Sequence, residues 1–179
     1  MVIQAPGTLQ EMLIQMTGQY TRDIIVDAGK CTDCLDCVEA CQQAIAHEHT
    51  VIAPVARIAI RKAAAEGGIH LPILCRNCAE APCVSACMSG CRIRDSSGWV
   101  VTHYDRCVGC WMCVMSCPFG AIEIVQEEEL ARKCDGCTSY EIPPCVSACE
   151  PGALRVAGQA NFAHERRRAF AARAGAWPG

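Results

Sequence analysis

The sequence predicts a small α+β fold of short strands and helical turns, with a core made largely of cysteine. The chain has 179 residues and 17 Cys, but only seven Leu and three each of Phe, Trp and Tyr. Bulky side chains of these types supply most of the apolar area that an ordinary core buries. The segments between the cysteine groups are short and β-branched, and each group ends in a spacer of about one helical turn. Something other than apolar packing must therefore hold the fold together.

Cysteine at this density indicates either a disulfide-rich secreted scaffold or a set of metal sites. The N-terminus shows no signal peptide, and no uncharged apolar run approaches the roughly 20 residues that a membrane helix needs. We therefore expect a cytoplasmic chain without a membrane span, whose reduced thiols bind metal, unless a partner with its own signal exports it. The formal charge of -3 gives no reason to expect nucleic-acid binding.

Sixteen of the cysteines fall into four groups. The groups are Cys31, Cys34, Cys37, Cys41; Cys75, Cys78, Cys83, Cys87; Cys107, Cys110, Cys113, Cys117; and Cys134, Cys137, Cys145, Cys149. The first and third read C-x-x-C-x-x-C-x-x-x-C, the bacterial ferredoxin run in which three thiolates bind one 4Fe-4S cluster and the fourth serves its neighbour. Structural zinc is the alternative, but four zinc ligands do not explain the third and fourth cysteines of every run. The groups therefore predict thiolate ligands for four 4Fe-4S clusters.

The second and fourth groups form an internal repeat with the first and third. Both keep C-x-x-C and C-x-x-x-C at their ends, and both finish with Pro-Cys-Val-Ser-Ala-Cys, at 82–87 and at 144–149. A glycine, Gly90, Gly120 or Gly152, follows three of the four groups. We expect these glycines to adopt a positive φ in a tight exit turn.

The cysteine left over, Cys91, occupies the position of Ala121 and Ala153 in the sister groups. We expect it to be a small buried side chain and not a ligand. His47 and His49 lie in a polar stretch without further ligands at suitable spacing. A solvated loop is therefore expected there in preference to a metal site.

Five short strands are expected, over 23–26, 56–61, 99–103, 121–125 and 153–156, with a connection at 62–68 that turns at its glycines. Residues 1–21 are an N-terminal extension with a Met-rich helix predicted over 8–19, which we expect to dock to a partner because its Met side chains would otherwise be exposed. Residues 158–179 are a basic tail that suits a short helix. Self-association through these extensions is also compatible with the sequence.

Several features resemble a known group of proteins: the motif order, the repeated Pro-Cys-Val-Ser-Ala-Cys, Leu74-Cys-Arg-Asn-Cys78 and the Cys149-Glu-Pro-Gly-Ala-Leu exit. They are similar to the four-cluster iron-sulfur subunits of molybdenum and tungsten oxidoreductases, carbon monoxide dehydrogenases and formate-linked hydrogenases. The resemblance covers about residues 22–157. Within that group, the small size and the terminal segments look most similar to the electron-transfer subunit of a bacterial tungsten aldehyde oxidoreductase.

The resemblance implies two dicluster ferredoxin modules, with a central one, 63–126, inserted into an outer one of 22–62 and 127–157. In such subunits the first and fourth groups exchange their last cysteines, as do the second and third. The implied sets are Cys31, Cys34, Cys37 with Cys149; Cys134, Cys137, Cys145 with Cys41; Cys75, Cys78, Cys83 with Cys117; and Cys107, Cys110, Cys113 with Cys87. The residues alone also permit a tandem arrangement, which pairs the first group with the second and the third with the fourth. Met88 and Gln42 stand where the family has Pro, a departure expected to loosen the helical turns there.

The resemblance implies single-electron transfer by a non-catalytic subunit, and the sequence shows no phosphate loop, nucleophile-base signature or open metal site. Lys30, Arg106 and Lys133 each precede a first ligand and are expected to raise the potential of the adjacent cluster, with a solvated charge as the alternative for each. The expected partners are a catalytic oxidoreductase subunit of the molybdenum, tungsten or nickel-iron type and a second redox subunit. The alternatives are a free-standing polyferredoxin and a cluster-based redox sensor.

Overall fold

The computed structural model describes residues 23–48, 55–65, 67–96 and 98–175. The chain divides into two compact units, one of residues 26–155 and a terminal one of residues 1–25 with 156–179. The helix predicted over 8–19 and His49 lie outside the described residues. In the part of the chain that the structure covers, every helix is too short or too polar to cross a membrane.

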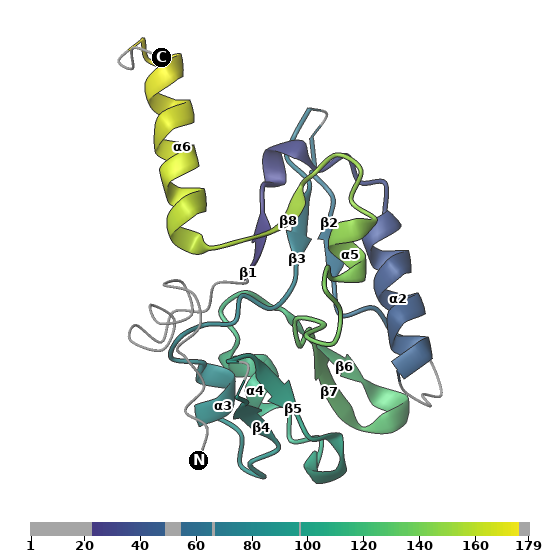
Figure 1. Ribbon diagram of the computed structural model, residues 1–179. Coiled ribbons are helices and arrows are strands. Elements are labelled where there is room, and N and C mark those ends of the chain that lie inside the picture. The colour runs from purple at the N-terminus through teal and green to yellow at the C-terminus, as the bar shows by residue number, and fades with distance from the viewer. Residues whose placement is uncertain (1–22, 49–54, 66, 97, 176–179) are drawn as a thin grey trace, which may run out of the picture. The chain divides into compact units, whose positions relative to one another are not determined.

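The strands pair into two-stranded ribbons (Figure 1). The pairs are β1 (Asp23–Val26) with β8 (Leu154–Ala157), β2 (Ala59–Arg61) with β3 (Leu71–Ile73), β4 (Arg92–Arg94) with β5 (Val100–Thr102), and β6 (Ile122–Val125) with β7 (Leu130–Lys133). The last three pairs are antiparallel. All five predicted strands are present, although those expected over 56–61 and 99–103 are shorter than predicted.

The ribbons include three strands that the sequence analysis did not predict, β3, β4 and β7. Each has only three or four residues, and each carries Pro72 or basic residues in place of a β-branched run. Pairing with a neighbouring strand, and not local propensity, makes these segments extended. The connection between β2 and β3 turns at Gly67, which has a φ of 74°, as the glycines at 67 and 68 predicted.

Three of the cysteine groups end in one helical turn, as expected: α3 (Pro82–Ser85), α4 (Met112–Ser116) and α5 (Pro144–Ser147). The first group differs, because α2 (Asp36–Glu48) has 13 residues. Gln42 replaces the Pro that follows Cys117, and no glycine follows Cys41, so nothing interrupts the helix. The expected loosening at Gln42 is therefore wrong, and so is the loop predicted at His47, which lies on α2 with its side chain exposed.

Short 3-10 turns η1 (Ala28–Lys30) and η2 (Tyr104–Arg106) precede the first and third cysteine groups, and η3 (Gln126–Glu128) connects the two strands of the β6–β7 ribbon. The three exit glycines adopt the predicted positive φ, with values of 65° at Gly90, 60° at Gly120 and 66° at Gly152. These turns carry the backbone from the last cysteine of the second, third and fourth groups into β4, β6 and β8.

The helices pack in pairs that link distant groups. Helix α2 of the first group contacts α5 of the fourth, and α3 of the second contacts α4 of the third (Figure 1). Cys113, Ile122 and Ala131 form a buried cluster, against which Cys83 and Cys117 pack. Cysteines are therefore part of the buried core, but Ile, Val, Leu, Ala and Trp99 make up more of it, so the expectation of a core made largely of cysteine is met only in part.

The tail contains the helix expected within 158–179, α6 (Gln159–Arg173). None of its residues is buried. At its start the side-chain amide of Gln159 donates to Oδ2 of Asp23, at 2.9 Å. Burial raises the pKa of Asp23, and the hydrogen bond from Gln159 partly opposes this.

Candidate metal centre

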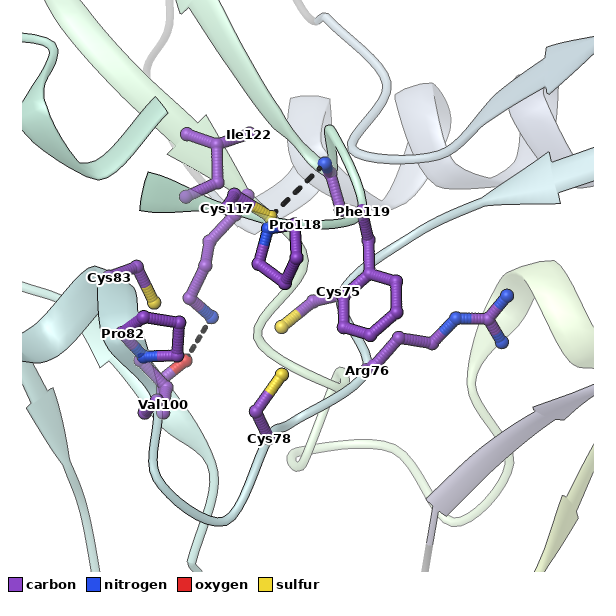
Figure 2. Close-up of a pocket in the computed structure, with 13 residues that line it drawn as sticks. Cys75, Arg76, Cys78, Pro82, Cys83, Val100, Cys117, Pro118, Phe119 and Ile122 are labelled. Carbon is purple, nitrogen blue, oxygen red and sulfur yellow. Dashed lines mark hydrogen bonds between the residues drawn. The ribbon is translucent and has the colours of Figure 1, made fainter. Parts of the chain in front are cut away.

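Cysteines from two different groups meet around one cavity. Cys75, Cys78 and Cys83 of the second group line it together with Cys117 of the third. Figure 2 shows the thiols of Cys75, Cys78 and Cys83 pointing toward a common space, whereas the guanidinium of Arg76 points away from it. The remaining walls are mostly apolar and include Pro82, Val100, Pro118, Phe119 and Ile122. The structure therefore brings together one of the four cysteine sets that the family resemblance implies.

A second cavity repeats this arrangement with the first and fourth groups. Cys31, Cys34 and Cys37 line it with Cys149, which follows α5. Ile60 of β2 and Pro72 of β3 cover one side, and Asp33 is the acidic residue of the wall. Asp33 and Leu35 have positive φ values of 60° and 69°, so the loop between Cys31 and Cys37 is wound tightly around the space.

Two pairs of the remaining cysteines lie near partners that the resemblance implies. Burial, together with the nearby thiols of Cys41 and Cys37, raises the pKa of Cys145 to about 12. Burial raises the pKa of Cys91 to about 11, and the nearby thiols of Cys87 and Cys107 contribute to this shift. Cys87 of the second group and Cys107 of the third therefore both lie near Cys91. The packing of α2 on α5 and of α3 on α4 accounts for both neighbourhoods.

Among the described residues, five backbone N–H groups donate to cysteine sulfurs at 3.3–3.4 Å. The N–H of Asn77 donates to Sγ of Cys75, and the N–H of Gly136 donates to Sγ of Cys134, both at 3.4 Å. In both cases the donor follows the first cysteine of its group by two residues. The other three donors are Ala121 to Cys117 at 3.4 Å, Leu154 to Cys149 at 3.3 Å, and Arg57 to Cys41 at 3.3 Å. Hydrogen bonds to sulfur stabilise negative charge on a thiolate and tune a cluster's potential. The sequence analysis did not find these donors, because the loop conformation that aims each N–H is not visible in the cysteine spacing.

The thiols lie in an environment that disfavours their charge unless a metal binds them. Burial raises the pKa of Cys37 to about 11, and the pKa of Cys134 well above its usual value. Metal coordination deprotonates a thiol outright, so binding must overcome this cost. Among the described residues, no three Cys, His, Asp or Glu side chains converge closely enough to hold a single metal ion. In the cavity of Figure 2 the sulfurs of Cys75, Cys78 and Cys83 lie around a common space, an arrangement that suits a multi-iron cluster.

Cys91 is buried, as predicted from its alanine counterparts, with 3% of its surface exposed. Its Sγ lies 3.4 Å from Sγ of Cys87, and the hydroxyl of Ser89 lies 3.7 Å from the same sulfur. Although burial works against a thiolate, the backbone N–H of Arg92 and the Cys91 and Ser89 side chains lower the pKa of Cys87 to about 7. Cys91 is thus more than a small apolar filler, since its thiol is placed to donate to Cys87.

The three basic residues that precede first ligands differ in exposure. Lys30 and Arg106 end 3-10 turns and are exposed, whereas Lys133 ends β7 and is 2% exposed. Lys133 also lines the cavity of Cys75, Cys78, Cys83 and Cys117, although it precedes Cys134 in the sequence. Arg57, Arg92 and Arg132 are three further buried cations that the sequence analysis did not single out.

Comparison with known proteins places the chain in a family. The family model described as a 4Fe-4S dicluster domain matches residues 68–159. The chain belongs to the 4Fe-4S dicluster domain family. This dicluster protein is an iron-sulfur electron-transfer protein of the ferredoxin type, and 4Fe-4S clusters are its cofactors.

Its curated relatives have names that fit this family. An uncharacterized ferredoxin of Methanocaldococcus jannaschii is 37% identical over 135 residues, which are 75% of this chain and 72% of that protein. Electron transport protein HydN of Escherichia coli is 34% identical over 156 residues, which cover 74% of this chain and 86% of HydN. The thiosulfate reductase electron transfer subunit PhsB of Salmonella typhi is 30% identical over 152 residues, which cover 78% of this chain and 76% of PhsB. The dicluster protein thus matches most of the length of each relative.

Proposed function

We propose that this chain binds four 4Fe-4S clusters through 16 cysteines and serves as the electron-transfer subunit of a larger oxidoreductase complex. The observation that carries the proposal is the meeting of cysteines from two groups around one cavity, as for Cys117 with the second group and Cys149 with the first. A cluster that takes one thiolate at each iron suits such a set. A single zinc ion, with each sulfur about 2.3 Å from the metal, suits it less well.

The ligand exchange proposed is the nested one. Cys117 shares a cavity with the second group and Cys149 shares one with the first, and these are the exchanged partners of that arrangement. The packing of α2 on α5 and of α3 on α4 supports the same pairing for Cys41 with the fourth group and for Cys87 with the third. A tandem arrangement requires Cys149 to serve the third group, whose thiols do not line its cavity. The outer module of 22–62 with 127–157 and the inner module of 63–126 follow from this exchange.

The four cysteine sets are proposed to lie in a row. Cys34 of the first set and Cys110 of the third group are exposed, whereas Cys134 is buried. Cys75 is among the charged neighbours of Cys134, so the sets of the second and fourth groups lie next to each other in the middle. We infer that redox partners approach the two ends, near Cys34 and Cys110, because electron tunnelling needs a short distance to a cluster.

The chain's own residues prepare the sites for this role. When bound, the clusters accept and release single electrons. Apolar walls such as Pro82 and Phe119 keep water from the sulfurs, and the five N–H donors stabilise the negative charge that reduction adds. Because the ligands sit on short ribbons and helical turns fixed by one another, they need little rearrangement when the charge changes.

The partner proposed is a catalytic oxidoreductase subunit, with a second redox subunit at the other end of the row. The support comes from relatives named as electron transfer subunits, such as PhsB of a thiosulfate reductase. The molybdenum, tungsten or nickel-iron type of that catalytic subunit, including a tungsten aldehyde oxidoreductase, rests on the sequence resemblance alone. A cytoplasmic location, a non-catalytic role, and partner docking or self-association through the terminal extensions are also proposed, from the sequence.

Iron and acid-labile sulfide analysis of the anaerobically purified full chain tests the cofactor proposal. Four groups of about four irons each predict about 16 irons and about 16 sulfides per chain. Zinc in the protein, or far fewer irons than this, would sink the proposal. Gel filtration of the native cell extract tests the subunit role, because migration of the chain by itself would indicate a free-standing polyferredoxin.

A pair of ligand substitutions tests the exchange. In the nested arrangement Cys34→Ala and Cys149→Ala damage the same cluster, so the double variant should lose one cluster signal in electron paramagnetic resonance (EPR) spectra. In the tandem arrangement the two cysteines serve different clusters, and the double variant should lose two. Cys34→Ala with Cys37→Ala is the matched control, since both arrangements place these two cysteines on one cluster.

A further inference from the structure

Four basic side chains are buried in the described part of the chain: Arg57, Arg92, Arg132 and Lys133, with 7%, 1%, 4% and 2% of their surfaces exposed. Burying a charge is costly unless an opposite charge or several hydrogen bonds compensate it. Arg57 pairs with Asp135, and Arg132 pairs with Glu128. Arg92 and Lys133 differ from these two, because the described residues give neither of them a carboxylate partner.

Lys133 and Arg92 donate only to uncharged oxygens. The ammonium of Lys133 donates to the carbonyl oxygen of Val100, a hydrogen bond drawn as a dashed line in Figure 2, and to that of Cys134 at 2.7 Å. Arg92 donates to the carbonyl oxygen of Ala131 at 2.7 Å and to the hydroxyl of Thr102 at 3.0 Å, while its Nε is buried without a partner. Two buried positive charges are thus left without a counter-charge among the described side chains.

The nearest candidates for that counter-charge are the cysteine sulfurs of the cavity in Figure 2. Lys133 lines this cavity together with Cys75, Cys78, Cys83 and Cys117. Burial raises the pKa of Cys83, and the positive charges of Arg92 and Lys133 oppose this shift more than any other group does. Both cations therefore favour negative charge at this cavity.

The cavity of the first and fourth groups has the opposite electrostatic character. Its lining residues include Asp33 and no basic side chain. Oδ1 of Asp33 is buried without a hydrogen-bond partner, and the cation paired with its other oxygen, Lys62, is 66% exposed. A solvated cation compensates little of a buried negative charge. The two cavities thus present similar cysteine sets with different surrounding charge.

We propose that Lys133 and Arg92 hold the cluster of Cys75, Cys78, Cys83 and Cys117 at a more positive reduction potential than the cluster of Cys31, Cys34, Cys37 and Cys149. This inference rests on the proposed function. Reduction adds one electron to a cluster and no atom to the protein, so a fixed positive charge nearby stabilises the reduced form. Asp33 disfavours the reduced form at the other cavity for the same reason. An electron is therefore held more strongly on this cluster than on the one near Cys34.

The test is an anaerobic redox titration of the full chain, followed by EPR. The EPR signal that Cys78→Ser alters is assigned to the cluster of Cys75, Cys78, Cys83 and Cys117. Lys133→Met and Arg92→Met should each lower the midpoint potential of that signal. We expect the ratio of reduced to oxidised cluster at the original midpoint to fall about tenfold, which equals about 59 mV for a one-electron couple.

Matched controls separate charge from structure. Lys30→Met and Arg106→Met remove exposed cations at the equivalent sequence positions and should leave all midpoints unchanged. Arg92→Lys keeps the positive charge and should keep the midpoint potential, whereas Arg92→Met should lower it. This pair of variants tests the proposal even if Lys133→Met does not fold. Thr102→Val removes a hydrogen bond of Arg92 without removing charge, and it should also leave the midpoint unchanged.

The outcomes distinguish this inference from the function on which it rests. A wild-type protein without iron and sulfide would defeat the proposed function. A protein with four clusters in which Lys133→Met and Arg92→Met leave the midpoint of the identified signal unchanged would overturn only the role of the two cations. A shift as large in Thr102→Val as in Arg92→Met would also overturn it, because the effect would then come from packing.

Discussion

Gly136 lies between Cys134 and Cys137, where the structure leaves no room for a side chain. Its φ is 83°, and a Cβ placed on it would lie 2.4 Å from two ring atoms of Trp99. Trp99 is itself buried, with 4% of its surface exposed, so the ring cannot move aside into solvent. The N–H of Gly136 also donates to the sulfur of Cys134 at 3.4 Å. We therefore predict that Gly136→Ala destabilises the loop that holds the fourth cysteine group.

Gly152 supplies a control with the same backbone conformation and no clash. Its φ is 66°, and a Cβ placed on it would meet no atom within 4 Å. A left-handed conformation costs a non-glycine residue about 1–2 kcal/mol in either position. Overpacking against a buried ring costs a further 1–3 kcal/mol or so, and only Gly136→Ala incurs it. The free energy of unfolding should therefore fall by about 1–3 kcal/mol more for Gly136→Ala than for Gly152→Ala.

The assay is thermal unfolding of the two variants with their clusters bound, followed anaerobically by the visible absorbance of the clusters at one fixed scan rate. For a chain of this length, each kcal/mol shifts the melting temperature by about 2–4 °C, so the variants should differ by about 2–12 °C. Equal melting temperatures would refute the argument from the contact with Trp99. A lower melting temperature for Gly152→Ala would refute it more strongly.

Three further predictions concern the clusters and the terminal extension. Cys91→Ala should keep four clusters but lower the potential of the one that Cys87 serves, because a thiol donor 3.4 Å from that sulfur is lost; loss of a cluster signal in EPR would instead make Cys91 a ligand. Anaerobic removal of iron by a chelator should leave the chain largely unfolded by circular dichroism, because bonds between iron and thiolate replace much of the apolar core; a compact apo chain would contradict this. Deletion of residues 1–20 should weaken co-purification with the partner, and undiminished assembly would show that docking does not need this extension.

The cofactor could be predicted from the sequence because its ligands are close together in the chain. Three of the four cysteines of each implied set fall within 12 residues, and the first and third groups repeat one spacing. The glycine turns after Cys87, Cys117 and Cys149 are local as well, and their positive φ values follow from steric limits on a single residue. Short β-branched strands such as β1 and β6 were found for the same reason.

The features that the sequence analysis missed depend on contacts between distant segments. Strands β3, β4 and β7 are extended because a neighbour pairs with them, and α2 continues beyond one turn because nothing after Cys41 stops it. In the sequence, Lys30, Arg106 and Lys133 each stand directly before the first cysteine of a group. The end of a 3-10 turn leaves the first two in solvent, whereas the pairing of β7 with β6 buries Lys133.

The sequence by itself determined the kind of cofactor, the cysteines available to bind it and the short elements between them, because each depends on residues that are neighbours in the chain. The tertiary structure alone decided which cysteines of different groups share a cavity, which backbone N–H groups reach the sulfurs, and which cations are buried beside them. Arg92 shows the reason most clearly. Its position between Thr102 and Ala131 brings together segments 10 and 39 residues away, and no local pattern predicts the charge that they place near Cys83.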